Sequence, residues 1–294
     1  MDIPIVDFID EKGGFLLKRA IVVFVEDKRP LKLQLQGLYT SYKYIDSKDT
    51  DLVVFGTKEA LAWVPDDCIK VEYNVLSEPA VFLNYRFINS ISCLVGSQAD
   101  FLDNYDLILR TDADTFLTPA WNFFYPQLYT VGQGGYSNND EVRENIKRVA
   151  DHFGLRHQGV HNLGSTHYGN ARLVRQVSKL AVSLSEYLLT TEFKDSQGAW
   201  PGWYSGVTTM YSCEIAVNHF VEEFVIDGRR LDYGSAATDS IATHPHIHCW
   251  HTDSMFSKFQ FEAGNYDHLS TEDLDINKVN NYCLYMALKS QEDK

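Results

Sequence analysis

The sequence predicts an α/β fold in which helices flank a central, mostly parallel β-sheet. Short apolar runs rich in β-branched residues alternate with helix-like stretches in the first half of the chain, and the connections are short. This alternation is typical of parallel strands, because the helix that joins two of them covers one face of the sheet. The 294 residues are enough for one large domain.

The first half of the chain contains four predicted strands. Ala20–Val25 is a continuous β-branched run, as expected of a strand that is buried on both faces. Pro30 is typical of a first helical turn and begins a helix that extends to about Ile45. A second helix is expected from about Glu78 to Phe101. The remaining predicted strands are Asp51–Phe55, Ile69–Tyr73 and Tyr105–Arg110.

The second half is rich in Gly, His, Trp and Tyr and predicts a second lobe built on the first. Helices are expected near Asp140–Phe153, Asn170–Thr191 and Met210–Phe224, with loops between them. We find no linker, repeat or low-complexity tract. The chain is therefore expected to form a single domain.

Composition narrows the classes of function. A net charge of −14 disfavours a nucleic-acid partner, because such a field repels phosphate backbones. We expect a soluble, cytoplasmic protein, since there is no apolar run of membrane-spanning length and the N-terminus does not resemble a signal peptide. The five cysteines form no CxxC pair, which favours reduced thiols.

Two aspartates directly follow the fourth predicted strand. Asp112 and Asp114 stand two residues apart, so on an extended backbone both carboxylates project to the same side. Hard divalent cations bind carboxylate oxygens and leave positions open for substrate phosphates. In open α/β sheets, ligands bind beyond the carboxyl ends of the strands. The pair therefore predicts a metal site at that edge, although two aspartates that cap the turn would give the same letters.

Two other metal-binding motifs do not fit these letters. The phosphatase motif DxDxT requires Thr where Phe116 stands. An EF-hand loop requires an oxygen ligand and a glycine at the positions of Phe116 and Leu117. Arg110 precedes the pair and could either form an ion pair with Asp112 or reach a phosphate.

The wider pattern resembles a known family. The segments LRTDADTFLTP, NLGSTHYGNARLV, SGVTTMYSCEIAVNH and HIHCWHTDSMFSKFQF resemble DxD-containing glycosyltransferases of the GT-A fold, in particular a group of algal and large-virus glycosyltransferase-like proteins. The resemblance covers about residues 20–265. It implies a nucleotide-binding half at about 18–120, an acceptor half at about 121–265 and a C-terminal helix or tail at 266–294, all within one domain 1–294.

The same resemblance implies cofactors and their ligands. Mn²⁺ or Mg²⁺ would be held by Asp112 and Asp114, with Ala113 between them in the nucleotide-sugar motif. The family usually draws a third ligand from a C-terminal histidine, and His248 or His251 fits that role. Lys258 is expected to bind the diphosphate. His244, His246, His248 and His251 could alternatively begin a zinc hydrolase site.

Residues for substrate binding are predicted in the second half. Trp200 and Trp203 offer aromatic faces to sugar rings, and Gly206 lets the backbone approach a ligand. The loop that contains the following residues could line the donor sugar pocket, or serve only as a helix entry: Asn162, Gly164 and Ser165.

Acidic residues provide candidate bases and nucleotide contacts. In inverting enzymes of the resembling fold an acidic residue acts as general base on the acceptor hydroxyl, and the resemblance implies Glu214, or else Asp239, for this role. Glu214 could instead be a buried partner of Asn218. Glu26 and Asp27, after the first strand, are expected to border the base and ribose.

These features together predict transfer of a hexose, pentose or deoxyhexose from a nucleoside-diphosphate sugar, such as a UDP-sugar, to a hydroxyl of a carbohydrate or glycoprotein acceptor. A non-catalytic carbohydrate-binding protein of the same fold is the alternative from a different class.

Overall fold

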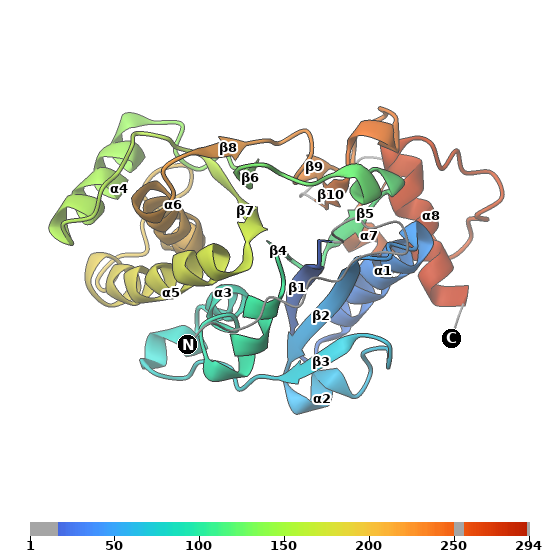
Figure 1. The fold of residues 1–294 in the computed structure, drawn as a ribbon, viewed down its shortest axis with the longest axis horizontal. Helices are drawn as coiled ribbons and strands as arrows, with labels where there is room; N and C mark the ends of the chain where they lie inside the picture. Colours follow the sequence, from blue (N-terminus) through green and yellow to red (C-terminus); the bar gives the residue numbers. More distant parts are fainter. Residues whose placement is uncertain (1–16, 250–255, 293–294) are drawn as a thin grey trace.

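A computed structural model describes residues 17–249 and 256–292, and it confirms an α/β fold with a mostly parallel central sheet flanked by helices (Figure 1). The sheet has seven strands: β1 (Arg19–Val25), β2 (Thr50–Gly56), β3 (Ile69–Glu72), β4 (Leu107–Arg110), β6 (Tyr129–Gln133), β7 (Leu163–Asn170) and β8 (Phe224–Ile226). Their spatial order is β3–β2–β1–β4–β7–β6–β8. Only β7 runs antiparallel to its neighbours, β4 and β6.

Helices cover both faces of this sheet. Side chains that alternate along β1 separate the two cores: Ala20 and Val22 face one, and Ile21 and Val23 face the other. Helices α3 (Asn89–Ser92), α5 (Ala171–Tyr187) and α6 (Thr208–Phe220) contribute to the first core, and α1 (Arg29–Ile45) and α2 (Lys58–Leu61) contribute to the second. Helix α4 (Asp140–His152) packs against α6 at the far end of the molecule (Figure 1).

A small second sheet lies beside the carboxyl end of β4. It contains β5 (Thr115–Leu117), β10 (His246–His248) and β9 (Tyr233–Gly234) in the order β5–β10–β9. Helix α8 (Val279–Glu292) packs on it, and the Tyr282 hydroxyl donates to the Leu117 carbonyl at 2.6 Å. Helix α7 (Lys258–Glu262) also lies next to α1. This sheet brings the C-terminal histidine segment against the residues that follow β4.

Two secondary-structure predictions were wrong. The expected helix from Glu78 to Phe101 is instead a series of short turns: 3₁₀ segments at Ala80–Leu83, Arg86–Ile88 and Ser97–Asn104, and the single turn of α3. Two side chains explain part of the break, because the Asn89 amide donates to the Arg86 carbonyl at 3.2 Å and the Ser90 hydroxyl donates to the Phe87 carbonyl at 2.8 Å, and these bonds compete with helical ones. The segment before α5 was expected to be a loop and is instead strand β7. Most of its residues are buried, and it pairs with β4 and β6 in the large sheet.

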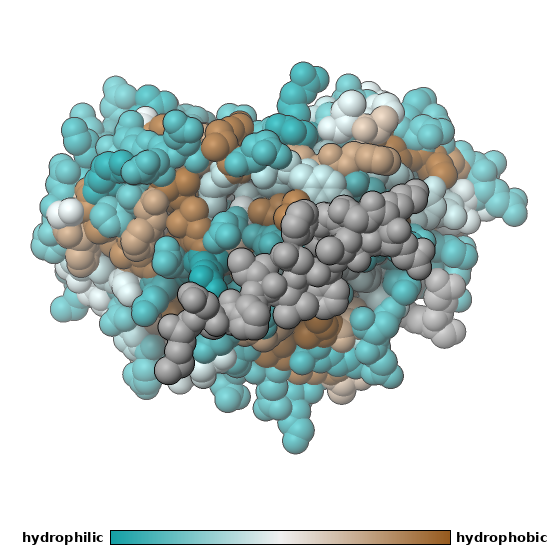
Figure 2. Space-filling model, viewed as in Figure 1, coloured by the Kyte–Doolittle hydropathy of each residue, from teal (hydrophilic) through white to brown (hydrophobic). Residues whose placement is uncertain are grey.

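Two other sequence-based expectations can be compared with the model. All five cysteines are free and buried. Within the described residues, no helix combines the length and the apolar character needed to cross a membrane. Hydrophilic residues cover most of the face seen in Figure 2, and hydrophobic ones gather there in separate patches.

One buried charge ties the amino ends of β1 and β2 together. The Arg19 side chain is fully buried, and its guanidinium donates to Asp49 at 2.6 Å and to the Trp121 carbonyl at 3.1 Å. A buried cation without its carboxylate would cost several kcal/mol. The ion pair therefore fixes the edge of the sheet opposite to the Asp112 edge.

We predict that Asp49→Ala lowers the free energy of unfolding by about 3–5 kcal/mol, because it leaves the Arg19 charge buried and unpaired. The measurement is urea unfolding, in which a lower midpoint at an unchanged slope reports lost stability. Asp66→Ala is the matched control, since the Asp66 side chain is fully exposed and pairs with Lys70 at the surface. Equal midpoints for the two variants would contradict this account of Arg19.

Candidate metal centre

Asp112 and Asp114 occupy the turn that joins the two sheets. Strand β4 ends at Arg110 and β5 begins at Thr115, so both aspartates lie at the carboxyl edge of the large sheet, as the sequence predicted. The turn is anchored at each end. The Thr115 hydroxyl donates to the Asp112 carbonyl at 2.9 Å, and the Cys249 N–H donates to the Asp114 carbonyl at 3.0 Å.

Strand pairing brings His248 to this turn. Strand β10 runs antiparallel to β5 with His248 opposite Thr115. The Nε2 atom of His248 consequently lies 3.3 Å from Oδ1 of Asp114. Ligand atoms of Asp112, Asp114 and His248 all lie within 4.8 Å of one another. Three residues from two segments more than 130 positions apart can thus hold one cation. His251, the other predicted ligand, lies outside the described residues.

A residue that sequence reasoning missed orients His248. The Asp232 carboxylate is buried and lies 3.1 Å from Nδ1 of His248, on the opposite side of the ring from Asp114. It also accepts from the N–H and the hydroxyl of Thr166, at 3.2 and 2.5 Å. A carboxylate that accepts the Nδ1 proton leaves the Nε2 lone pair available to bind a metal. Histidine ligands of metal sites usually have a hydrogen-bond acceptor of this kind at the other ring nitrogen.

The backbone around Asp232 is adapted to hold that carboxylate. Asp232 itself has a positive φ of 59°. A Cβ atom at Gly132 or at Gly164 would overlap the Asp232 carboxylate. Both glycines lie on adjacent strands, β6 and β7, so their missing side chains create the space. Gly164, predicted to contact substrate, therefore has a packing role here.

The electrostatics of the centre depend on these neighbours. Burial alone would raise the pKa of Asp114, but the adjacent His248 and Lys258 outweigh it and hold that pKa well below its usual range. Burial alone would lower the pKa of His248, but Asp114 and Asp232 raise it well above its ordinary value. Asp232 has a pKa lowered to about 2, because His248 and Thr166 offset its burial. The proton on His248 therefore offsets part of the negative charge of the aspartates.

Two further cations contact the aspartates. Lys258, at the start of α7, forms an ion pair with Asp114 through Nζ and Oδ2. Arg110 is buried and lies 3.3 Å from Asp112, while its other N–H groups donate to Ser90 and to the Ser165 carbonyl. Of the two roles left open for Arg110, the ion pair with Asp112 is therefore the one present.

A cavity of about 140 Å³ adjoins Asp112. Two residues predicted to contact substrate, Ser165 and Gly206, line this cavity together with the candidate metal ligand Asp112. The lining also includes Arg110 and the side chains of Phe87, Ser90, Ile91, Val207, Thr209, Met210 and Cys213.

The candidate bases do not line this cavity. Glu214 is fully buried in α6, and its carboxylate accepts from the Tyr136 hydroxyl and His161 Nδ1, both at 2.7 Å, and from the Asn162 N–H at 2.8 Å. A base must reach the acceptor hydroxyl. The geometry instead makes Glu214 a structural carboxylate, and its own carbonyl accepts from Asn218 at 2.9 Å.

Asp239 is also remote from the cavity. It is exposed and accepts from the Tyr233 hydroxyl at 2.7 Å, in a segment that pairs with the chain before α8. Neither predicted base therefore has a place beside Asp112 in this structure.

The remaining predicted contacts divide into packed and exposed residues. Trp203 stacks on Tyr211 with ring centroids 4.4 Å apart, so it belongs to the core between α4 and α6. Trp200 is 55% exposed. Asn162 has a φ of 63°, and its side chain accepts from the Ser137 N–H at 2.8 Å, which is a turn role.

The residues after β1 lie at the same sheet edge as the metal ligands. Strands β1 and β4 are parallel neighbours, with Val22 opposite Arg110. Glu26 pairs with Lys28 at 2.6 Å, and Asp27 accepts from the Trp63 indole at 3.0 Å.

A second group of metal-type ligands is explained by hydrogen bonds. His157, His161 and Glu214 also lie within 4.8 Å of one another. However, Nδ1 of His157 accepts from the Gly159 N–H at 3.1 Å, which places the proton of a neutral ring on Nε2, the atom that faces Glu214. That nitrogen then has no lone pair for a metal, and the two histidines instead surround the buried Glu214 carboxylate.

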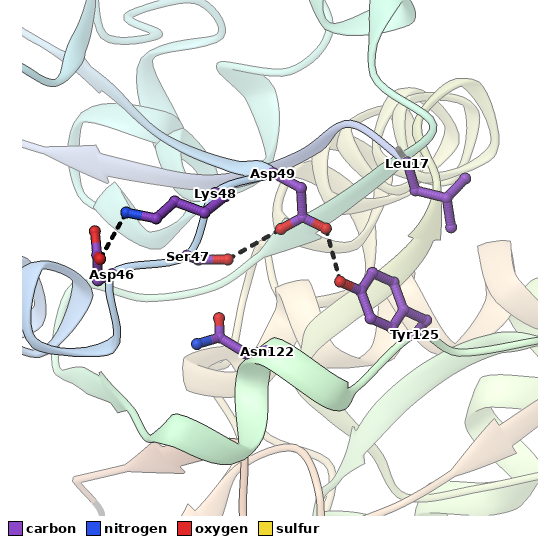
Figure 3. Close-up of a pocket in the computed structure, with 7 residues that line it drawn as sticks. All are labelled: Leu17, Asp46, Ser47, Lys48, Asp49, Asn122 and Tyr125. Carbon is purple, nitrogen blue, oxygen red and sulfur yellow. Dashed lines mark hydrogen bonds and ion pairs between the residues drawn. The ribbon is translucent and has the colours of Figure 1, made fainter. Parts of the chain in front are cut away.

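A larger cavity lies away from the metal centre. Its volume is about 460 Å³, and it adjoins the amino ends of β1 and β2 (Figure 3). Asp49, which lines it, is hydrogen-bonded to Ser47 and Tyr125, as Figure 3 shows, and also to the buried Arg19. Ligands of open α/β sheets bind at the opposite, carboxyl edge, so we place the functional site at Asp112.

Comparison with known proteins identifies the family of the chain. Residues 15–293 match the model of a domain of unknown function, DUF7164, which is nearly the whole sequence. The chain therefore belongs to the DUF7164 family. No curated protein matches it.

We predict that Asp232→Asn weakens Mn²⁺ binding by about 10–100-fold, because the histidine loses the carboxylate that orients it. Isothermal titration calorimetry measures the affinity. Asp239→Asn, an exposed carboxylate outside the centre, should bind Mn²⁺ as the wild type does. If Asp232→Asn also bound normally, Asp232 would not position a ligand.

We also predict that Mn²⁺ affinity rises with pH. The pKa of His248 is raised, so the metal must displace a proton, and affinity should change by about tenfold per pH unit below that pKa. Titrations in buffers of different ionisation enthalpy count the proton released. An affinity that is constant between pH 6 and 8, with no proton release, would exclude His248 as a ligand.

Proposed function

We propose that this member of the DUF7164 family is a metal-dependent glycosyltransferase of the GT-A type, which moves a sugar from a nucleoside-diphosphate sugar to a hydroxyl acceptor. The single observation that carries the proposal is the convergence of Asp112, Asp114 and His248 beside a cavity at the carboxyl edge of a mostly parallel sheet. That edge is where open α/β sheets bind nucleotides and similar ligands.

The ligand set suits Mn²⁺ or Mg²⁺. Two carboxylates supply hard oxygen donors, and one imidazole is compatible with Mn²⁺. Three protein ligands leave coordination positions for substrate oxygens. A divalent cation bound there would act as a Lewis acid that neutralises the leaving diphosphate.

Cationic side chains near the aspartates bear on how the donor diphosphate would be bound. Lys258 contacts Asp114 and brings a second positive charge to the centre, in keeping with its predicted contact to diphosphate. Arg110 has its N–H groups engaged by Ser90 and Ser165, so its role is to hold Asp112. Glu26 and Asp27 follow the neighbouring strand β1, which supports their expected place near the base and ribose.

The alternatives find less support. A zinc hydrolase would draw on several histidines of the 244–251 segment, but His244 bonds to the Arg229 carbonyl at 2.7 Å. Nδ1 of His246 accepts from the Asp232 N–H at 3.1 Å, and its Nε2 lies 2.9 Å from the Thr111 hydroxyl. Of the described histidines in that segment, only His248 is left to join the aspartates. A non-catalytic carbohydrate-binding protein is separated from a transferase by assaying release of free sugar from the donor.

We predict that Asp112→Asn and Asp114→Asn each abolish metal-dependent turnover of the donor while the fold is retained, since each removes one charge from the metal centre. The assay follows hydrolysis or transfer from UDP-, GDP- and dTDP-sugars with Mn²⁺ and with chelator. Asp273→Asn, an exposed aspartate elsewhere, should keep full activity.

Thermal shifts on the same donors provide the binding readout. A true donor with Mn²⁺ should stabilise the wild type and not the two variants, because stabilisation scales with ligand concentration over Kd. Full activity in either variant, or no stabilisation by any donor with Mn²⁺, would contradict the proposal.

A further inference from the structure

The cavity beside Asp112 has an apolar side that the metal centre does not use. Its lining combines the polar residues Asp112 and Ser165 with the apolar residues Phe87, Ile91, Val207 and Met210. A cavity with both polar and apolar lining suits a ligand that has both kinds of surface. A pyranose ring is such a ligand, because hydroxyls surround its edge while its C–H groups form an apolar face.

Phe87 forms an exposed aromatic rim of this cavity. It is 67% exposed and lines the cavity, so its ring is accessible to a ligand. Its ring packs edge-on against Tyr85, with centroids 5.6 Å apart. The Tyr85 hydroxyl in turn accepts from the Thr209 N–H at 3.0 Å. These contacts connect Phe87, through Tyr85, to the start of α6, where Thr209 also lines the cavity.

Hydrogen bonds also connect Phe87 to the metal ligands. The Ser90 hydroxyl donates to the Phe87 carbonyl at 2.8 Å and itself accepts from Arg110. Arg110 is the residue that pairs with Asp112 at 3.3 Å. The backbone at Phe87 is therefore held relative to Asp112, and the contact with Tyr85 orients the ring, which favours a preorganised binding surface.

The size of the cavity bears on the ligand. Its volume of about 140 Å³ is below the roughly 300–1,000 Å³ of sites for drug-sized molecules. The cavity therefore suits one part of a nucleotide-sugar, such as its single sugar ring, better than the whole molecule.

We propose that this cavity is a subsite for one pyranose ring, whose apolar face stacks on Phe87 while its hydroxyls reach Asp112 and Ser165. The inference rests on the proposed function, because it assigns the sugar to one side of the metal centre. It adds that Phe87 determines affinity for the sugar and leaves metal and nucleotide binding unchanged.

Phe87→Ala, Phe87→Trp and the control Phe123→Ala test the proposal. Phe123 is 86% exposed and lies outside the cavity lining, so it matches the change in exposed aromatic surface. Ligand-observed NMR measures binding of a panel of free hexoses, 6-deoxyhexoses and pentoses. Calorimetry measures binding of Mn²⁺ with UDP, GDP and dTDP in the same variants.

We expect Phe87→Ala to weaken binding of the preferred monosaccharide about tenfold, the order of one lost aromatic stacking contact. Phe87→Trp should retain binding, and Phe123→Ala should match the wild type. All variants should bind Mn²⁺ and nucleotide equally.

The failures are distinguishable. Monosaccharide binding that is unaffected by Phe87→Ala overturns the subsite and leaves the proposed function intact, and so does binding of Mn²⁺ with nucleotide but of no free sugar. Loss of nucleotide binding in Phe87→Ala overturns the division of the site. Absence of both sugar and nucleotide binding in the wild type overturns the subsite and the proposed function together.

Discussion

Two carboxylates at the end of one buried strand impose the main electrostatic constraint on this molecule. Asp112 and Asp114 stand next to one another where the sheet ends, and Asp114 is almost entirely buried. Burying such charges is costly unless cations are placed against them. Arg110 comes from the same strand, His248 from the small sheet and Lys258 from α7. The compensating charges thus require three parts of the chain to meet.

The small sheet supplies one of these compensating charges, on His248. Pairing of β10 with β5 delivers His248, and the return of the chain through Asp232 holds its ring. Space for the Asp232 carboxylate comes from glycines on β6 and β7. The antiparallel strand β7 therefore serves the centre twice, by carrying Gly164 and by presenting the Thr166 groups that bind the carboxylate. Changes at these positions should act on the metal centre even though none of them would touch the metal.

Local patterns predicted the parts of the fold that local physics decides. The β-branched run at 20–25 and the apolar run at 107–110 lie in buried strands, and the position of the aspartates followed from the second of these. The segment 78–101 was mispredicted because the side chains of Asn89 and Ser90 bond to backbone carbonyls that a continuous helix would use. The family resemblance indicated His248 or His251 as a ligand, but Asp232 lies in an unremarkable stretch, and only the folded chain places it against the His248 ring. Glu214 had the residue type of a base, whereas its burial among Tyr136, His161 and Asn162 depends on tertiary packing that no spacing reveals.

Pulsed electron paramagnetic resonance on the Mn²⁺-loaded protein tests the central claim, that His248 completes a metal centre with Asp112 and Asp114. We predict a single directly coordinated ¹⁴N coupling in the wild type that disappears in His248→Gln. It should persist in His244→Gln, whose ring bonds to the Arg229 carbonyl instead. A spectrum with only oxygen and water ligands, or a nitrogen coupling that survives in His248→Gln, would contradict the account.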